Sequence, residues 1–262
     1  MSILRLVAPV AVLMACSPLP AAQLITVELK PATVEAFDGY VRAAEQRQRE
    51  RSSFLWTFQT DRERRRLRNG EVLVEPAAGK SEMEVPDGLI HDWIGTVFVP
   101  GASVDQVMAL VQNYDRHSQI YPEVTTSKIV QHNGNAYRIY LRLLKKKVVT
   151  VVLNTEHDVR YIPVDAKRWQ SRSYSTRIAE VDKPGTPKER ELPTGKDHGF
   201  LWRLYSYWRF EESDGGVYIE CEAISLTRDV PTGFGWLVRP IIRSLPRESL
   251  AGTLEATRTA LR

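Results

Sequence analysis

The sequence predicts an α+β fold, in which a curved antiparallel sheet wraps around a long C-terminal helix. Three observations support this prediction. A strand and a helix are followed by about six consecutive segments with strand character, and the chain then ends in a helical segment. Several of these strands are about 11–14 residues long, and strands of that length twist and curl around whatever they cover. A sheet curled around one helix leaves a space between them.

Composition excludes several classes of protein. Hydrophobic residues make up 43% of the 262 residues and charged residues 26%, which is typical of a globular chain. Two cysteines are too few for a disulfide scaffold or a cysteine-cluster metal site. The net charge of +4 is mild and does not by itself indicate a nucleic-acid partner.

The first part of the predicted sheet runs to residue 144. Leu89–Val99 has strand character, and Pro100-Gly101 ends it. Ser103 and Gln106 form a capping box, so a helix is expected from there to about Asn113. Strands are then expected over Thr125–Gln131 and Ala136–Leu144, joined by a turn at His132–Gly134.

The second part contains the long strands and the last helix. Strands are expected over Val148–Tyr161, Trp169–Val181, Gly199–Glu212 and Val217–Arg228, with a long loop over Asp182–His198. Phe234–Leu245 is strongly apolar, and Pro240 is expected to start or kink a helix. Ser244 followed by Pro246 suits a fresh helix N-terminus.

Residues 1–22 are expected to form an export signal. Arg5 precedes the apolar run Leu6–Ala15, and small residues follow at Ala21 and Ala22. Leu13–Cys16 resembles a lipobox, which would acylate Cys16 and tether the chain to a membrane; ordinary cleavage near Ala22 is the alternative. Either route predicts an exported protein, periplasmic or anchored by lipidation.

Residues 23–86 are expected to form a basic helical segment and a linker. Pro31–Arg51 has helical spacing, nine arginines lie between Arg42 and Arg68, and Pro76–Pro86 is polar and loop-like. Interleaved arginines and aromatics suit an anionic membrane or nucleic acid, but a solvated charged face with aromatics packed on the main domain is favoured. Export argues against nucleic acid as a partner.

Residues 87–262 resemble the helix-grip fold of the START / Bet v 1 / polyketide-cyclase (SRPBCC) superfamily. The order of elements carries the resemblance, together with the local stretches Gly95–Pro100, Asp115–Pro122, Trp202–Phe210 and Glu222–Pro231. The resemblance implies a hydrophobic cavity between the sheet and the last helix. It also implies a lipid, sterol-like, quinone or polyketide-like ligand.

No catalytic constellation is evident. The five histidines form no metal-binding pair, and no phosphate loop, nucleophile elbow or dinucleotide motif is present. We therefore expect no metal, no cofactor and no assigned catalytic residue. His157 is the one candidate for such a role. On the apolar face of its strand it suits a hydrogen bond to a ligand, or action as an acid or base. The favoured interpretation is a core histidine whose hydrogen bonds are satisfied within the protein.

The expected cavity residues combine aromatic and polar side chains. Glu222 and Arg228 are polar candidates that suit either a ligand head or a structural salt bridge. The full set comprises Trp93, His157, Trp202, Glu222, Arg228 and Trp236.

Three functions follow from these observations. The first is a non-enzymatic protein that binds or transfers a hydrophobic small molecule or lipid. Its Lys145, Lys146 and Lys147 turn would dock on anionic lipid. The second is a cyclase- or dehydrase-type enzyme that uses a cavity acid or base. The third is an interaction module without a ligand. The missing catalytic constellation favours the first.

Overall fold

The computed structural model describes residues 25–56, 60–147, 150–229 and 235–262, and for 235–243 only the backbone is described. Within these residues, one antiparallel sheet of ten strands has the order β2-β4-β12-β11-β8-β7-β6-β5, with β3 paired to β4 and β9 paired to β8. The strands are β2 (Leu73–Pro76), β3 (Glu82–Val85), β4 (Gly88–Pro100), β5 (Val124–Asn133), β6 (Ala136–Lys146), β7 (Thr150–Pro163), β8 (Arg168–Asp182), β9 (Arg190–Glu191), β11 (Arg203–Ser213) and β12 (Gly216–Arg228).

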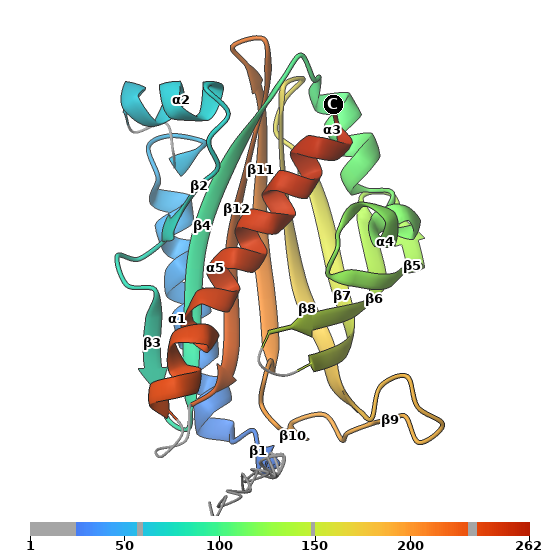
Figure 1. Ribbon diagram of the computed structural model, residues 1–262. Coiled ribbons are helices and arrows are strands. Elements are labelled where there is room, and N and C mark those ends of the chain that lie inside the picture. Colours follow the sequence, from blue (N-terminus) through green and yellow to red (C-terminus); the bar gives the residue numbers. More distant parts are fainter. Residues whose placement is uncertain (1–24, 57–59, 148–149, 230–234) are drawn as a thin grey trace, which may run out of the picture.

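Helices lie on both faces of this sheet (Figure 1). They are α1 (Pro31–Glu50), α2 (Asp61–Arg68), α3 (Val104–Val111), the 3₁₀ helix η2 (Tyr114–Arg116), α4 (His117–Ile120) and α5 (Gly235–Ala260). The sheet curls around α5, and α1 lies on the opposite face of the sheet. A separate two-stranded pair joins β1 (Val27–Glu28) to β10 (Lys196–Asp197).

The predicted α+β fold and order of elements are confirmed. Ser103 caps α3 through the predicted capping box, in which Gln106 returns the bond to the Ser103 backbone. The β5–β6 turn has Gly134 at φ 55°, and the β11–β12 turn has Gly215 at φ 76°, a left-handed conformation that glycine adopts without steric cost. Short local signals were sufficient here because each acts within a few residues.

Two local predictions are wrong. The expected loop over Pro76–Pro86 contains β3, which pairs with β4, so the polar stretch is an edge of the main sheet. The expected helix starts at Pro240 and near Ser244 are absent, since α5 is one continuous helix from Gly235 to Ala260. Strands β2 and β3, which precede residue 86, therefore belong to the same sheet as the strands that follow it.

Alternation along β4 defines the two faces of the sheet. An added Cβ at Gly95 would lie 2.8 Å from Leu254 Cδ1 of α5, so Gly95 and its odd-numbered neighbours face α5. Ile90 packs instead with Phe37 of α1. We call the α5 side the inner face and the α1 side the outer face. The main core lies on the inner face, where Val97, Phe210 and Ile219 are buried with α3 and with Leu254.

Candidate functional site

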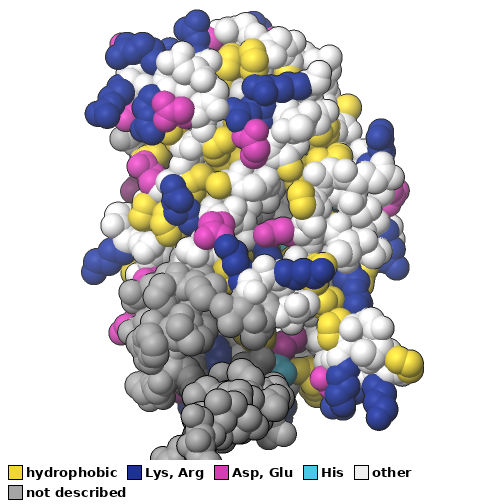
Figure 2. All heavy atoms as spheres, in the orientation of Figure 1, with side chains coloured by type: hydrophobic (Ala, Val, Ile, Leu, Met, Phe, Trp, Pro, Cys, Tyr) yellow, Lys and Arg dark blue, Asp and Glu magenta, His cyan; other side chains and the backbone are white. Residues whose placement is uncertain are grey.

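The inner face is only partly covered by α5. The helix packs against β2, β4 and β12, at one side of the sheet. Leu204 and Trp208 on β11 remain half-buried, although β11 lies near the middle of the sheet order. Partial exposure of side chains on a central strand shows that the middle of the inner face is incompletely covered, and we call this area the hollow. Figure 2 shows the molecule from the α5 side, with hydrophobic side chains exposed among scattered Lys and Arg side chains.

Serine side chains line the floor of this hollow. Tyr174 donates to Glu45 of α1 and therefore faces outward, so Ser173 and Ser175 beside it face inward, as does Ser171. Ser206 of β11 is the cross-strand partner of Ser173. We call these four residues the serine stripe: Ser171, Ser173, Ser175 and Ser206. Ser171 and Ser175 are buried, whereas Ser173 and Ser206 are half-buried.

His157 lies beside the stripe, as the cross-strand partner of Ser175. Its side chain is 3% exposed, and burial lowers its pKa to about 4. His157 Nε2 lies 3.0 Å from Thr155 Oγ1, which itself donates to the Leu141 carbonyl at 3.1 Å. The Thr155 hydroxyl has one proton, so it accepts from Nε2–H. Neutral His157 thus leaves Nδ1 as an acceptor, and no described residue partners it.

Acid should destabilise the fold through this histidine. An unfolded histidine has a pKa of about 6.5, so the unfolded chain binds the proton more readily than the folded chain between pH 6.5 and 4. We expect His157→Asn to reduce the loss of unfolding free energy between pH 6.5 and pH 4.5 by about 2 kcal/mol. Urea unfolding of both proteins at several pH values measures this, and parallel pH dependences would contradict it.

Trp93 lies on the inner face of β4, as predicted. It is 8% exposed and belongs to the core cluster that contains Leu250 and Leu254 of α5. Its Nε1 has no hydrogen-bond partner among the described residues. Trp93 and His157 therefore each carry a polar atom that lacks a partner among the described residues, and both lie on the inner face. They are not neighbours, because β12, β11 and β8 lie between β4 and β7 in the sheet. Trp236 lies on α5 where only the backbone is described, so its predicted lining role stays a prediction.

Trp202 is a correction to the predicted cavity set. It precedes β11, so the alternation of that strand does not fix its direction. Its Nε1 donates to Asp197 Oδ1 at 2.9 Å, and its ring packs with Phe37 and Val41 of α1. Trp202 therefore helps to hold α1 on the outer face.

Glu222 and Arg228 are also corrected. Both are even-numbered positions of β12, so their side chains point away from the face that carries Cys221 and Ala223. Cys221 belongs to the inner core and Ala223 packs against it. Glu222 accepts from Gln48 of α1 at 2.8 Å, and Arg228 donates to the carbonyl of Ile25 at 3.0 Å. Both side chains therefore make contacts on the outer face. For Glu222, the structure supports the alternative of a structural salt bridge.

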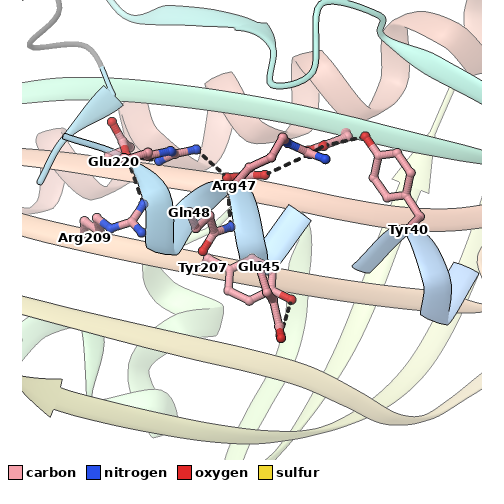
Figure 3. Close-up of polar contacts among 10 residues, drawn as sticks. Tyr40, Glu45, Arg47, Gln48, Tyr207, Arg209 and Glu220 are labelled. Atoms are coloured by element: carbon pink, nitrogen blue, oxygen red, sulfur yellow. Dashed lines mark hydrogen bonds and ion pairs between the residues drawn. The ribbon is translucent and has the colours of Figure 1, made fainter. Parts of the chain in front are cut away.

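Glu222 belongs to a buried ionic network beneath α1 (Figure 3). Arg51 pairs with Glu222 at 2.8 Å and with Glu220 at 3.2 Å, and Arg209 approaches Glu220 at 3.5 Å. Both glutamates are 1% exposed. Arg51 of the basic segment thus neutralises carboxylates of β12. Arg47 of the same segment neutralises a carboxylate of the neighbouring strand, β4.

Asp92 of β4 is the partner of Arg47. Its Oδ2 accepts from Tyr40 Oη at 2.7 Å and from Arg47 Nη2 at 3.0 Å. Burial, and then the neighbouring Glu222 carboxylate, raise the pKa of Asp92. The sequence signal for this network was the arginine-rich segment itself. The favoured prediction of aromatics packed on the main domain holds for Phe54, which packs against the cluster that contains Phe98 and Tyr218. The predicted solvated face is wrong for Arg51, which pairs with buried carboxylates.

The three lysines of the β6–β7 turn are not equivalent. Lys145 contacts Glu123 and Ser249, and Lys147 pairs with Glu248 of α5 at 2.5 Å. Lys146 is exposed. Docking of this turn on anionic lipid stays a prediction, with two of its three charges already paired.

Other kinds of site find little support. Among the described residues, no group of three or more His, Cys, Asp or Glu side chains is placed to hold a metal ion. Cys221 is a buried free thiol whose pKa is raised by burial, and Cys16 lies outside the described residues. No helix within the described ranges is both long and apolar enough to cross a bilayer.

Comparisons with known proteins concern the fold. No protein-family model matches the sequence, and no curated protein matches it. A STAR-related lipid transfer protein from Xanthomonas axonopodis is similar in structure at 17% identity and TM-score 0.48, over 70% of this chain and 99% of the other.

Two further solved structures are similar. Zhui aromatase/cyclase from Streptomyces sp. R1128 has 13% identity and TM-score 0.42, over 66% of this chain and 93% of its own. Human STARD10 has 12% identity and TM-score 0.42, over 76% and 79%. The fold of this chain is α+β, with a curved antiparallel sheet around a long C-terminal helix, the helix-grip arrangement that the sequence predicts.

Proposed function

We propose that this protein binds or transfers a hydrophobic small molecule or lipid, which it holds in the hollow of the inner face. One observation carries the proposal. Leu204, Ser206 and Trp208 on β11, and Ser173 on β8, stay half-buried on the face that α5 grips. Ligand sites are lined mostly by apolar side chains with a few placed polar groups, and the side chains of this area have that composition.

The state of His157 favours binding over acid–base catalysis. A general acid or base works best when its pKa lies near the operating pH. Burial holds the pKa of His157 at about 4, so the ring is neutral at pH 7 and is a poor proton donor. Its unpaired Nδ1 is nevertheless suited to accept a hydrogen bond from a ligand.

Filling the hollow tests the proposal. Ser173→Leu and Ser206→Leu each place a larger apolar side chain at a half-buried serine on the floor. The protein is incubated with a membrane lipid extract, re-purified and examined by native mass spectrometry. We expect a bound small molecule on the unsubstituted protein and at least a tenfold lower occupancy on the double variant.

Thr176→Leu is the matched control. Thr176 is exposed on the same strand, at the irregularity in the β7–β8 pairing. The Thr176→Leu protein should carry the same occupancy of bound small molecule as the unsubstituted protein. An unsubstituted protein that stays free of small molecules, or equal occupancy on the filled variant, would overturn the proposal.

We also propose that the protein is exported. The proposal rests on the charged start, apolar run and small residues of residues 1–22, which lie outside the described residues. Mass spectrometry of the mature protein from a producing cell tests it. Loss of about the first 22 residues supports ordinary cleavage, an acylated Cys16 as the first residue supports a lipid anchor, and an intact Met1 excludes both.

A further inference from the structure

The N-terminal helix α1 covers a carboxylate of the sheet whose hydrogen bonding is incomplete. Asp92 lies on the outer face of β4 and is 2% exposed. Its Oδ2 accepts from Tyr40 Oη at 2.7 Å and from Arg47 Nη2 at 3.0 Å, and both donors belong to α1. Its Oδ1 is buried and has no hydrogen-bond partner among the described residues. The docked helix therefore removes this carboxylate from water but leaves one of its oxygens unpaired.

The positive charge at Asp92 is shared with a second buried carboxylate. Arg47 Nη2 also lies 3.9 Å from Glu222 Oε1, and the Arg47 side chain is 39% exposed. Glu222 has further partners of its own, since its Oε2 accepts from Gln48 and from Arg51 at 2.8 Å each. Two neighbouring carboxylates in a buried site disfavour the ionisation of both. Asp92 is therefore the carboxylate of this pair whose charge is less well compensated.

The other groups around Asp92 come from the elements packed beside it on the outer face. On one side, β12 supplies Glu222, and beyond it Glu220 lies 3.5 Å from Arg209 of β11. On the other side, β2 places Glu75 opposite Ile94, and β3 places the uncharged Met83 opposite Ile90. Arg51, the C-cap residue of α1, acts on Asp92 from the end of the helix. Among the described residues, Arg47 is the one ion-pair partner of Asp92 within 4 Å.

Protonation of Asp92 is thereby linked to the docking of α1. With the helix in place, burial and then the Glu222 carboxylate raise the pKa of Asp92 from 3.8 to about 7. Without the helix, Asp92 would face water on the sheet surface, and its pKa would return toward the ordinary value. The docked form therefore binds the proton more readily. The stabilisation of docking by this proton is complete below about pH 4 and is lost as the pH rises through about 7.

We propose that α1 is a pH-sensitive clasp, which holds the sheet firmly when Asp92 carries a proton and loosens when Asp92 is ionised. The clasp is independent of what the hollow holds, because α1 and the hollow lie on opposite faces of the sheet. Loosening would uncover the apolar outer-face side chains on which Phe37 packs, among them Ile90 and Ile224. The surface that the protein presents would then differ between mildly acidic and neutral solution.

Hydrogen exchange of the α1 amides tests the clasp. Exchange is followed by mass spectrometry at pH 5.5 and pH 7.5, and rates are corrected for the intrinsic rate of each amide at each pH. We expect the ratio of open to closed α1 to rise about 10- to 30-fold between these pH values in the unsubstituted protein. In Asp92→Asn, whose amide stays neutral, the ratio should change less than about threefold.

Two further variants separate the clasp from a general charge effect. Glu35→Gln removes an exposed carboxylate of the same helix and should keep the pH dependence of the unsubstituted protein. Tyr40→Phe removes a hydrogen bond to the ionised Asp92, so its opening should follow a midpoint at higher pH. Urea unfolding verifies that each variant is folded, and Tyr40→Phe provides the test if the asparagine variant is not.

Three results would overturn the clasp. The first is an equal pH dependence of α1 opening in the unsubstituted and Asp92→Asn proteins. The second is a pH-dependent change that appears equally in the amides of β6, β7 and β8, since that would be an effect on the whole fold instead of on α1. The third is an unchanged midpoint in Tyr40→Phe.

Discussion

Replacing Arg51 with methionine should lower the free energy of unfolding by about 3–5 kcal/mol. Arg51 pairs with Glu220 and Glu222, which are each 1% exposed on the outer face of β12. Methionine keeps most of the side-chain volume but leaves buried carboxylates with fewer cationic partners. The cost of a broken buried ion pair comes mainly from the charge that remains unpaired. Urea unfolding at pH 7 measures the loss.

Arg49→Met is the matched control for this prediction. Arg49 lies in the last turn of α1, two residues before Arg51, with 63% of its side chain exposed, and its ion pair with Glu45 spans 3.9 Å. Exposed pairs of this kind contribute about 0–1 kcal/mol. The role assigned to Arg51 fails if both variants lose the same stability. A second variant, Glu222→Gln, should lose less than Arg51→Met, because it removes a buried charge instead of isolating one.

The second large effect concerns the docking of α5. Leu254 is fully buried and meets β4 at Gly95, where an added Cβ would lie 2.8 Å from Leu254 Cδ1. Leu254→Ala should lower the free energy of unfolding by about 2–5 kcal/mol, through lost burial and the cavity left behind. The α5 contacts with β4 outnumber those with β12 and β2, so Leu254 lies in the main contact between this helix and the sheet.

Gly252→Ala is the control on the same helix, with an expected effect of opposite sign. Gly252 is exposed, and an added Cβ would meet nothing within 4 Å. Alanine is favoured over glycine inside a helix by about 0.8–1 kcal/mol, so this variant should be more stable. Chemical unfolding of both variants decides. A Leu254→Ala protein as stable as the parent would show that α5 is held by other contacts.

The outer network has a consequence for how the N-terminal helix is held. α1 contributes buried apolar side chains, Phe37, Val41 and Ala44, and beyond them the ionic contacts of Arg47 and Arg51. Apolar burial supplies most of the favourable energy, while buried ion pairs contribute little net stability. Their geometry does fix the position of the helix along the sheet, since each guanidinium must meet its carboxylates.

Much of the fold could be predicted because its signals are local. The capping box at Ser103 and the turn at His132–Gly134 act within four residues. Alternation along β7 predicted correctly that His157 shares a face with Val159 and Tyr161. Trp93 was expected in the cavity set as an aromatic side chain, and the structure places it on the inner face of β4.

The errors arose where a pattern leaves two choices. Alternation shows that Glu222 and Cys221 point in opposite directions, but it does not show which of them meets α5 and which meets α1. Trp202 was grouped with β11 although the strand begins one residue later. Pro240 and Pro246 each suited the first turn of a helix, but both lie inside one continuous helix in the structure.

The sequence by itself determined the order of the elements, their periodicity and the α+β class, because these depend on neighbours within a few positions. Only the tertiary structure decided which face each residue occupies. The pairing of Arg51 with Glu222 joins residues 171 positions apart, and the serine stripe joins β8 to β11 across a long loop. Such contacts depend on which strands become neighbours and on how far α5 covers them, which no local pattern encodes.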